Sequence, residues 1–238
     1  MPYSLPANTP EQSQVKWEPV FRPELRTNKE LERFTDSIKI GTALAARLVA
    51  ACFVAIVIAM PAAAQVKDFL SVPGPLEFDG KSYGLAWSGQ PTANYVKQEY
   101  VPAGQKVETY AQMLLVEVVT GEIKVMDAVR SQVDALNKRK ASDPLVNISL
   151  VENKATGEAL LDFIASTKGA DGEYIVEWNA YRYAPYRGGA KTAGVLLYAV
   201  SHRAYGNQNA KTFLGGLKQF RQRQINALAK ADLPAAKR

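Results

Sequence analysis

The stretch from Trp178 to Gly189 contains the side chains of this sequence that are best suited to molecular recognition. Tyrosine and arginine provide flat surface, hydrogen bonds and cation–π contacts, a combination enriched at interfaces and in sugar or peptide sites. The alternative is that the aromatic side chains pack a sheet and the arginines are solvated. The five candidate binding residues are Tyr181, Arg182, Tyr183, Tyr186 and Arg187.

Side chains that could support catalysis are few. His202 is the only histidine, and it is adjacent to Ser201 in a predicted strand. Neighbouring strand residues point to opposite faces, so this pair cannot act as base and nucleophile. Asp162 and Glu177 each lie inside a predicted strand, and nothing in the sequence sets the separation that a glycosidase requires. We therefore expect no catalytic residue, no metal site and no cofactor.

An uncharged apolar segment from Leu48 to Ala64 follows the positively charged Lys39 and Arg47. This pattern is typical of a secretory signal, and its small-residue end predicts cleavage between Ala64 and Gln65. The alternative is an uncleaved membrane anchor, because the run reaches the lower limit of the roughly 17–25 residues that span a bilayer.

The N-terminal residues 1–38 precede this signal or anchor, which occupies 39–64. They are rich in Pro, Asn, Gln and charged residues and poor in aliphatic ones. Such a composition cannot bury enough apolar surface to offset the entropy of ordering. We expect either a disordered tail or a mis-assigned extension of the start.

The region from Gln65 onward lacks cysteine and is mildly basic. Cys52, the only cysteine, lies in the apolar segment, so disulfides and thiolate chemistry are excluded beyond it. This region has 22 Lys or Arg against 17 Asp or Glu, a formal net charge of +5. Because these charges are not clustered and the domain is predicted to be exported, we expect no nucleic-acid partner. The expected partner is an envelope protein or a cell-wall or membrane component, with membrane contact through Leu48–Ala64 if that segment is uncleaved.

Residues 76–230 are predicted to form one domain. Asp79-Gly80 predicts a tight hairpin, and the near-continuous apolar run at 110–119 predicts a central strand covered on both faces. Apolar residues every three or four positions predict helices over 122–140 and 209–230, the second capped by Asn209. The remaining predicted segments are strands at 95–101, 146–152, 158–167, 173–183 and 195–205, loops at 88–94 and 184–194, a linker at 65–75 and a flexible tail at 231–238.

Runs of strands with two helices predict an α+β fold, in which an antiparallel sheet of about 6–8 strands packs with two main helices. The order of elements over about 76–230 resembles the fold shared by PsbP, the Mog1 protein and DcrB-type periplasmic proteins. The segment 108–117 also resembles a strand of an uncharacterised exported family of Gram-negative bacteria. These resemblances imply a bacterial envelope protein that binds or assists rather than catalyses.

Three functions remain open at this point. The first is a non-enzymatic periplasmic or secreted protein that binds through a loop at 181–189 and the sheet edge. The second is an assembly factor held in the inner membrane by one uncleaved span, with its domain outside the cytoplasm. The third is a hydrolase with an unrecognised site, which a deep polar pocket with converging carboxylates would favour.

Overall fold

The computed structural model describes residues 18–19, 66–189 and 192–238. The predicted apolar segment Leu48–Ala64 and the cleavage site at Ala64 and Gln65 lie outside these ranges, as does almost all of the predicted N-terminal tail. Within the described ranges, no helix has both the length and the apolarity needed to cross a membrane.

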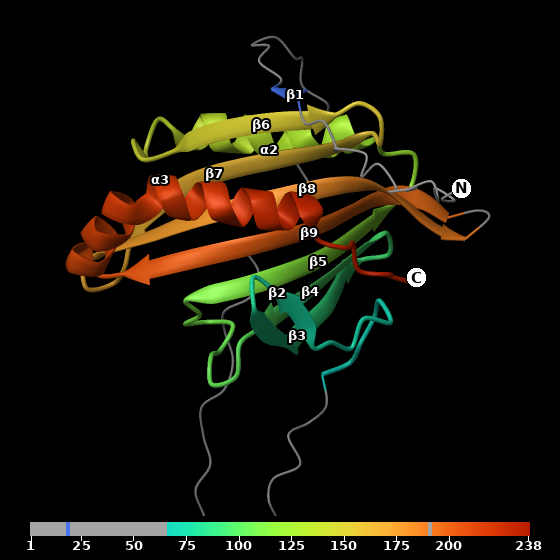
Figure 1. Cartoon of the computed structure of the whole chain (residues 1–238), viewed down its shortest axis with the longest axis horizontal. Coiled ribbons are helices and arrows are strands. Elements are labelled where there is room, and N and C mark those ends of the chain that lie inside the picture. Colours follow the sequence, from blue (N-terminus) through green and yellow to red (C-terminus); the bar gives the residue numbers. More distant parts are fainter. Residues whose placement is uncertain (1–17, 20–65, 190–191) are drawn as a thin grey trace, which may run out of the picture.

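One curled antiparallel sheet forms the body of the protein and carries a helix on each side (Figure 1). The strands are β1 (Glu18–Pro19), β2 (Leu76–Phe78), β3 (Lys81–Thr92), β4 (Tyr95–Val101), β5 (Gln112–Thr120), β6 (Asn147–Asn153), β7 (Glu158–Lys168), β8 (Tyr174–Gly189) and β9 (Thr192–Tyr205). The helices are α2 (Val125–Arg139) and α3 (Asn207–Lys230).

The strand order is β1-β6-β7-β8-β9-β5-β4-β3-β2. α3 packs on one face over β8 and β9, and α2 packs on the other face over β7, β8 and β9. The α+β class and the antiparallel sheet with two helices are therefore confirmed. Strands β2 to β9 fall within the predicted number, and the two-residue β1 pairs with β6 at the sheet edge.

The hairpin between β2 and β3 turns at Asp79-Gly80, as predicted. Both residues have positive φ, 47° at Asp79 and 74° at Gly80, as the tight two-residue turn requires. The predicted loop at 88–94 is wrong over most of its length, because β3 continues to Thr92 and pairs there with Tyr95.

β5 lies inside the sheet between β4 and β9, and both of its faces are covered, as predicted. Leu114, Val116 and Val118 join the core beneath α3. Met113 and Leu115 alternate with them and join the core beneath α2. This strand therefore ties the two cores together.

The predicted buried face of the first helix is confirmed. Val125, Val129 and Leu136 are buried on α2, with Met126 and Val133 packed beside them. The helix itself is shorter than predicted at both ends, since it runs from Val125 to Arg139.

The buried face of α3 is also confirmed, but its predicted cap is not. Leu228 is fully buried, and Leu217 is partly buried against the same core. The helix begins after Gly206, and the Asn209 side chain donates to the Tyr205 carbonyl oxygen at 2.9 Å instead of capping the helix.

The predicted loop at 184–194 is wrong, because β8 runs to Gly189 and β9 starts at Thr192. Ala184 is opposite Leu196 and Tyr186 is opposite Gly194. Glycine and proline usually interrupt strands. Here, however, a Cβ at Gly194 would lie 2.0 Å from the Val119 carbonyl oxygen. The glycine therefore permits close approach of β9 to β5.

The segments that flank the predicted domain contact each other. Leu70 is fully buried in the core beneath α3, and the Lys237 N–H donates to its carbonyl oxygen at 2.7 Å. Leu233 packs against the same core, and the Arg238 guanidinium donates to Thr120 Oγ1 at 3.1 Å. The predictions of a linker at 65–75 and a flexible tail at 231–238 do not anticipate these contacts.

Candidate functional site

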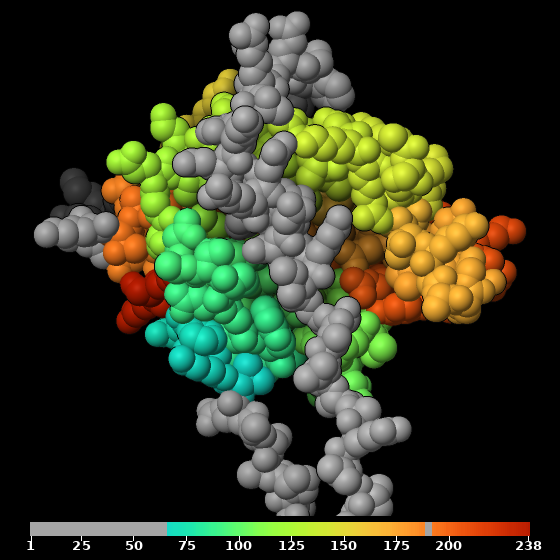
Figure 2. All heavy atoms as spheres, turned by 180° about the vertical axis from the view of Figure 1, so that it is seen from behind, coloured from blue at the N-terminus to red at the C-terminus, as the bar shows by residue number. Residues whose placement is uncertain are grey.

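A cavity of about 1110 Å³ lies on the α2 side of the sheet. It lies beside α2, which packs over β7, β8 and β9, and it extends along the same face of the sheet to β4 and the Glu117 end of β5. Figure 2 shows this side of the molecule, with α2 in yellow-green and the segment from β2 to β4 in cyan and blue-green. The cavity is lined by α2 and by residues of β3, β4, β5, β7, β8 and β9.

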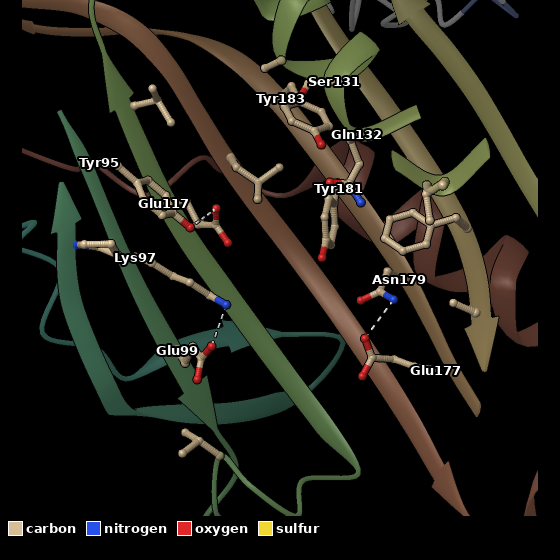
Figure 3. A pocket seen from close by; sticks show the side chains of 18 of the residues that line it. Tyr95, Lys97, Glu99, Glu117, Ser131, Gln132, Glu177, Asn179, Tyr181 and Tyr183 are labelled. Carbon is tan, nitrogen blue, oxygen red and sulfur yellow. Dashed lines mark hydrogen bonds and ion pairs between the residues drawn. The ribbon is translucent and has the colours of Figure 1, made fainter. Parts of the chain in front are cut away.

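The β4 side of the cavity is polar because every second residue of this strand faces it. Tyr95 donates its hydroxyl hydrogen to Glu117 Oε2 at 2.9 Å, and Lys97 Nζ lies 2.7 Å from Glu99 Oε1 (Figure 3). Val96 and Tyr100 alternate with these residues and pack in the opposite core. The pattern of the strand thus separates a polar face from an apolar one.

Glu117 lies on β5 opposite Lys97 and has an unusual electrostatic environment. Among the described residues, the salt bridge of the Lys97 ammonium is with Glu99, and Lys97 acts on Glu117 through its charge without a salt bridge to it. Burial raises the pKa of Glu117 and Glu99 adds to the rise, while Lys97 and the Tyr95 hydrogen bond oppose it. The net direction is upward, so this carboxyl holds its proton more tightly than a solvated glutamate does.

Tyr181 and Tyr183 project from β8 into the same cavity (Figure 3). Neither hydroxyl has a hydrogen-bond partner among the described residues. Burial raises the pKa of both phenols well above its ordinary value, and the charge of Glu117 adds to the rise. Both side chains are therefore neutral hydroxyls, available to donate and to accept.

Glu177 sits at the other end of the cavity in a closed network. It accepts from the Arg203 Nε at 2.6 Å, from the Tyr110 hydroxyl at 2.7 Å and from the Asn179 Nδ2 at 3.1 Å. The Arg203 guanidinium also lies over the Tyr110 ring, 4.2 Å from its centroid. These contacts fix the position of Glu177.

Trp87 lines the cavity from β3 and is 40% exposed, unusual for so large an apolar side chain. Its indole covers Gly89, where a Cβ would lie 2.6 Å from Trp87 Cη2. The absence of a side chain at Gly89 therefore allows the ring to lie close against the strand.

The five binding residues predicted from sequence alternate between the two faces of β8. Tyr181 and Tyr183 line the cavity, whereas Tyr186 is buried in the core beneath α3 and Arg187 is exposed. The stretch is thus part of a strand and does not stand clear of the sheet as a loop. The binding role of these residues stays a prediction, and the cavity brings together only the two tyrosines at 181 and 183.

Arg182 has a structural environment on the α3 face. Its Nε donates to Glu158 Oε2 at 2.6 Å. Its Nη1 donates to the carbonyl oxygens of Leu228 and Ala231, at 3.0 and 2.7 Å. The guanidinium therefore satisfies one carbonyl group in the last turn of α3 and that of the residue just after the helix.

The residues considered for catalysis do not converge. His202 faces α3, with its ring 4.4 Å from that of Phe220, and burial together with Lys81 lowers its pKa to about 4. Ser201 faces the other side and donates to Asn179, as the alternation predicts. Asp162 pairs with Arg221 on the α3 face, away from Glu177. The described ranges contain no group of three or more His, Cys, Asp or Glu able to hold a metal.

Glu117, Tyr95, Lys97 and Glu99 were not among the residues predicted from sequence. A single carboxylate inside an apolar run and the alternation Tyr-x-Lys-x-Glu on β4 are the patterns that could have identified them. Neither pattern alone distinguishes a cavity from a solvated sheet face.

A protein-family model matches residues 70–233, which include every cavity residue named above. This family is uncharacterised, so the match brings no activity, ligand or partner. No curated protein and no solved structure matches the chain. Export and the resemblance to the fold of PsbP stay predictions.

Proposed function

We propose that this chain, which belongs to the uncharacterised family whose model it matches, is a non-enzymatic protein that binds a small polar ligand in the cavity beside α2. The observation that carries the proposal is the set of unpartnered polar groups there. The hydroxyls of Tyr181 and Tyr183 and one oxygen of Glu117 face the cavity without a protein partner among the described residues. Polar groups that line a cavity and have no protein partner are satisfied by water or by a ligand.

The size and lining of the cavity support a ligand rather than a few waters. Its volume of about 1110 Å³ is slightly above the roughly 300–1,000 Å³ typical of small-molecule sites. Phe163, Leu136 and Leu197 contribute apolar wall among many polar side chains, and only a few of the polar groups are left without a partner in the described residues. Such a combination gives affinity through buried area and specificity through a small number of hydrogen bonds.

The compartment remains part of the proposal. The apolar segment Leu48–Ala64 favours a periplasmic or secreted protein, whose ligand would be a component of the envelope. The alternative is a single-pass protein of the inner membrane that acts as an assembly factor. Sequencing the N-terminus of the purified protein separates the two, since Gln65 as first residue supports cleavage.

Binding can be tested by ligand-observed NMR with a panel of amino acids, amines and mono- and disaccharides. Ser131 of α2 lines the cavity, so Ser131→Trp should fill it and abolish the binding seen with the unmodified chain. Asn137→Trp places the same side chain at an exposed position of the same helix and is the matched control. If no compound binds, or if binding survives Ser131→Trp in a folded protein, the cavity is not the site.

A hydrolase is the second candidate, because Glu99, Glu117 and Glu177 line one cavity. A carboxyl with a raised pKa, such as that of Glu117, suits a general acid. The binding function is preferred because Glu99 is engaged by Lys97, and Glu177 by three donors. Release of nitrophenol from nitrophenyl glycosides or esters, lost in Glu117→Gln, would instead establish the enzyme.

A further inference from the structure

Every basic side chain that lines the cavity is already paired with an acid. The three pairs are Lys97–Glu99, Arg139–Asp143 and Arg203–Glu177. Two lining carboxylates, Glu117 and Glu108, have no basic partner within the described ranges. The lining therefore has an excess of negative charge once its own pairs are subtracted.

Glu117 is the deeper of these two carboxylates. Glu108 is exposed at the cavity edge, whereas Glu117 lies on β5 inside the sheet. Its only hydrogen bond within the described residues comes from the Tyr95 hydroxyl. Lys97 lies opposite Glu117 and offsets the cost of burying this carboxylate only in part, since the net pKa direction is still upward, so a cation brought from outside would offset that cost further.

Aromatic side chains surround this carboxylate. Tyr95 contacts it directly, and Tyr181 and Tyr183 face it from β8 across β9 (Figure 3). The charge of Glu117 contributes to the raised pKa of both β8 phenols, so their hydroxyls lie within its electrostatic reach. Tyrosine attracts cations through its ring face, and its oxygen accepts N–H donors.

We propose that the ligand presents a protonated amine or a guanidinium, whose N–H groups donate to the Glu117 carboxylate and to the hydroxyl oxygens of Tyr181 and Tyr183. This inference rests on the proposed binding function and specifies its ligand class. A neutral sugar could use the same hydroxyls, but it would add no positive charge beside Glu117. The cationic group belongs either to a free small amine or to a lysine or arginine side chain of a peptide.

Isothermal titration of the full chain can test the charge requirement. The cationic probes are cadaverine, N-acetyl-lysine methylamide and N-acetyl-arginine methylamide. The neutral probes are N-acetyl-norleucine methylamide, which has the lysine stem without its amine, and maltose. At least one cation should bind about tenfold more tightly than either neutral probe, a difference of about 1.4 kcal/mol.

Glu117→Gln is the decisive variant, since its amide oxygen can still accept from Tyr95 while the charge is lost. We expect cation affinity to fall about tenfold or more, with a cooperative thermal melt retained. Glu152→Gln removes a carboxylate on β6, which does not line the cavity, and should leave affinity unchanged. Tyr183→Phe, which removes only a hydroxyl, should weaken cation binding without loss of folding.

The probes also identify the source of the cation. Tighter binding of cadaverine supports a free amine, and tighter binding of the amino-acid derivatives supports a peptide side chain. Maltose or norleucine binding as tightly as the cations would overturn the inference while leaving the cavity as a binding site. Failure of all three cations at millimolar concentration, or full affinity in folded Glu117→Gln, would overturn it as well. Binding that survives Ser131→Trp would instead remove the proposed function itself.

Discussion

At the scale of single residues, Glu117 links the chemistry of the cavity to the stability of the fold. The groups that face it are Tyr95, Lys97 and Glu99 on β4 and Tyr181 and Tyr183 on β8. Lys97 favours its charged form, but burial and Glu99 favour the neutral form and dominate. A carboxyl in such surroundings takes up a proton more readily in the folded state than in the unfolded state.

This difference gives a pH prediction with a definite sign. Because the folded pKa lies above the ordinary value of 4.5, folding stability falls as the pH rises from 4.5 through the folded pKa. Glu117→Gln removes the titrating carboxyl, so this fall in folding stability should not occur in the variant. We expect the variant to melt at a higher temperature than the unmodified chain at neutral pH, with the advantage shrinking as the pH falls below 4.5. Thermal melts across this range are the measurement, and an advantage that grows toward acid would contradict the assignment.

Arg182 gives a second residue-scale prediction. It is buried, paired with Glu158 and bonded to the end of α3, so its removal leaves an uncompensated carboxylate and two unsatisfied carbonyl groups. Arg182→Ala should destabilise by about 3–5 kcal/mol, as for a broken buried ion pair. Arg187→Ala, at an exposed position of the same strand, should cost less than about 0.5 kcal/mol. Urea unfolding compares the two, and equal effects would place Arg182 outside a structural role.

At the scale of elements, the prediction of α3 can be checked residue by residue. Leu217 packs against the core, whereas the adjacent Lys218 is exposed. Leu217→Ala should cost about 2 kcal/mol, the low end for a core leucine, because Leu217 is only partly buried. Lys218→Ala should cost less than about 0.5 kcal/mol. Chemical denaturation measures both, and the reverse order would mean that the helix faces the sheet with its other side.

Local sequence patterns predicted several elements of this fold correctly. The structure of other segments depends on tertiary contacts. The backbone preferences of Asp79 and Gly80 are enough to predict their turn. The apolar residues that recur every three or four positions in α2 are enough to predict its buried face. The segment 184–194 was mistaken for a loop because Gly188-Gly189 and Pro185 suggest a break. The strands continue because β8 and β9 pair as one long hairpin and because Gly194 approaches β5, which lies far earlier in the chain.

The candidate site was less predictable than the fold. Tyr181 and Tyr183 were predicted as binding residues from residue type alone. The polar residues that share the cavity with them belong to β4 and β5, far earlier in the chain. Bringing them together depends on β5 pairing with β9 and on how much of the sheet α2 covers. Neither the β5–β9 pairing nor the part of the sheet that α2 covers can be predicted from local sequence patterns.

At the scale of the whole molecule, the two ends of the described domain support each other. Removing residues 231–238 would delete the Leu233 packing and the hydrogen bond from Lys237 to Leu70. We expect this truncation to cost about 1–3 kcal/mol, from lost apolar burial and backbone bonding. Lys237→Ala keeps the backbone bond and removes only an exposed side chain, so its melt should match that of the unmodified chain. A truncated protein of full stability would show that these contacts contribute nothing.

The position of β5 also sets the order in which the molecule can be assembled. Its second neighbour is β9, and their register brings Gln112 opposite His202 and Thr120 opposite Gly194. Until β9 has emerged, β5 is an unpaired edge with apolar side chains on both faces, the type of surface that aggregates. Such distant pairing makes folding slow. In pulse-labelling hydrogen exchange, amides of β5 should become protected together with those of β9 and after those of the local β6–β7 hairpin. The nascent chain therefore exposes this edge of β5 until residues 192–205 have been synthesised.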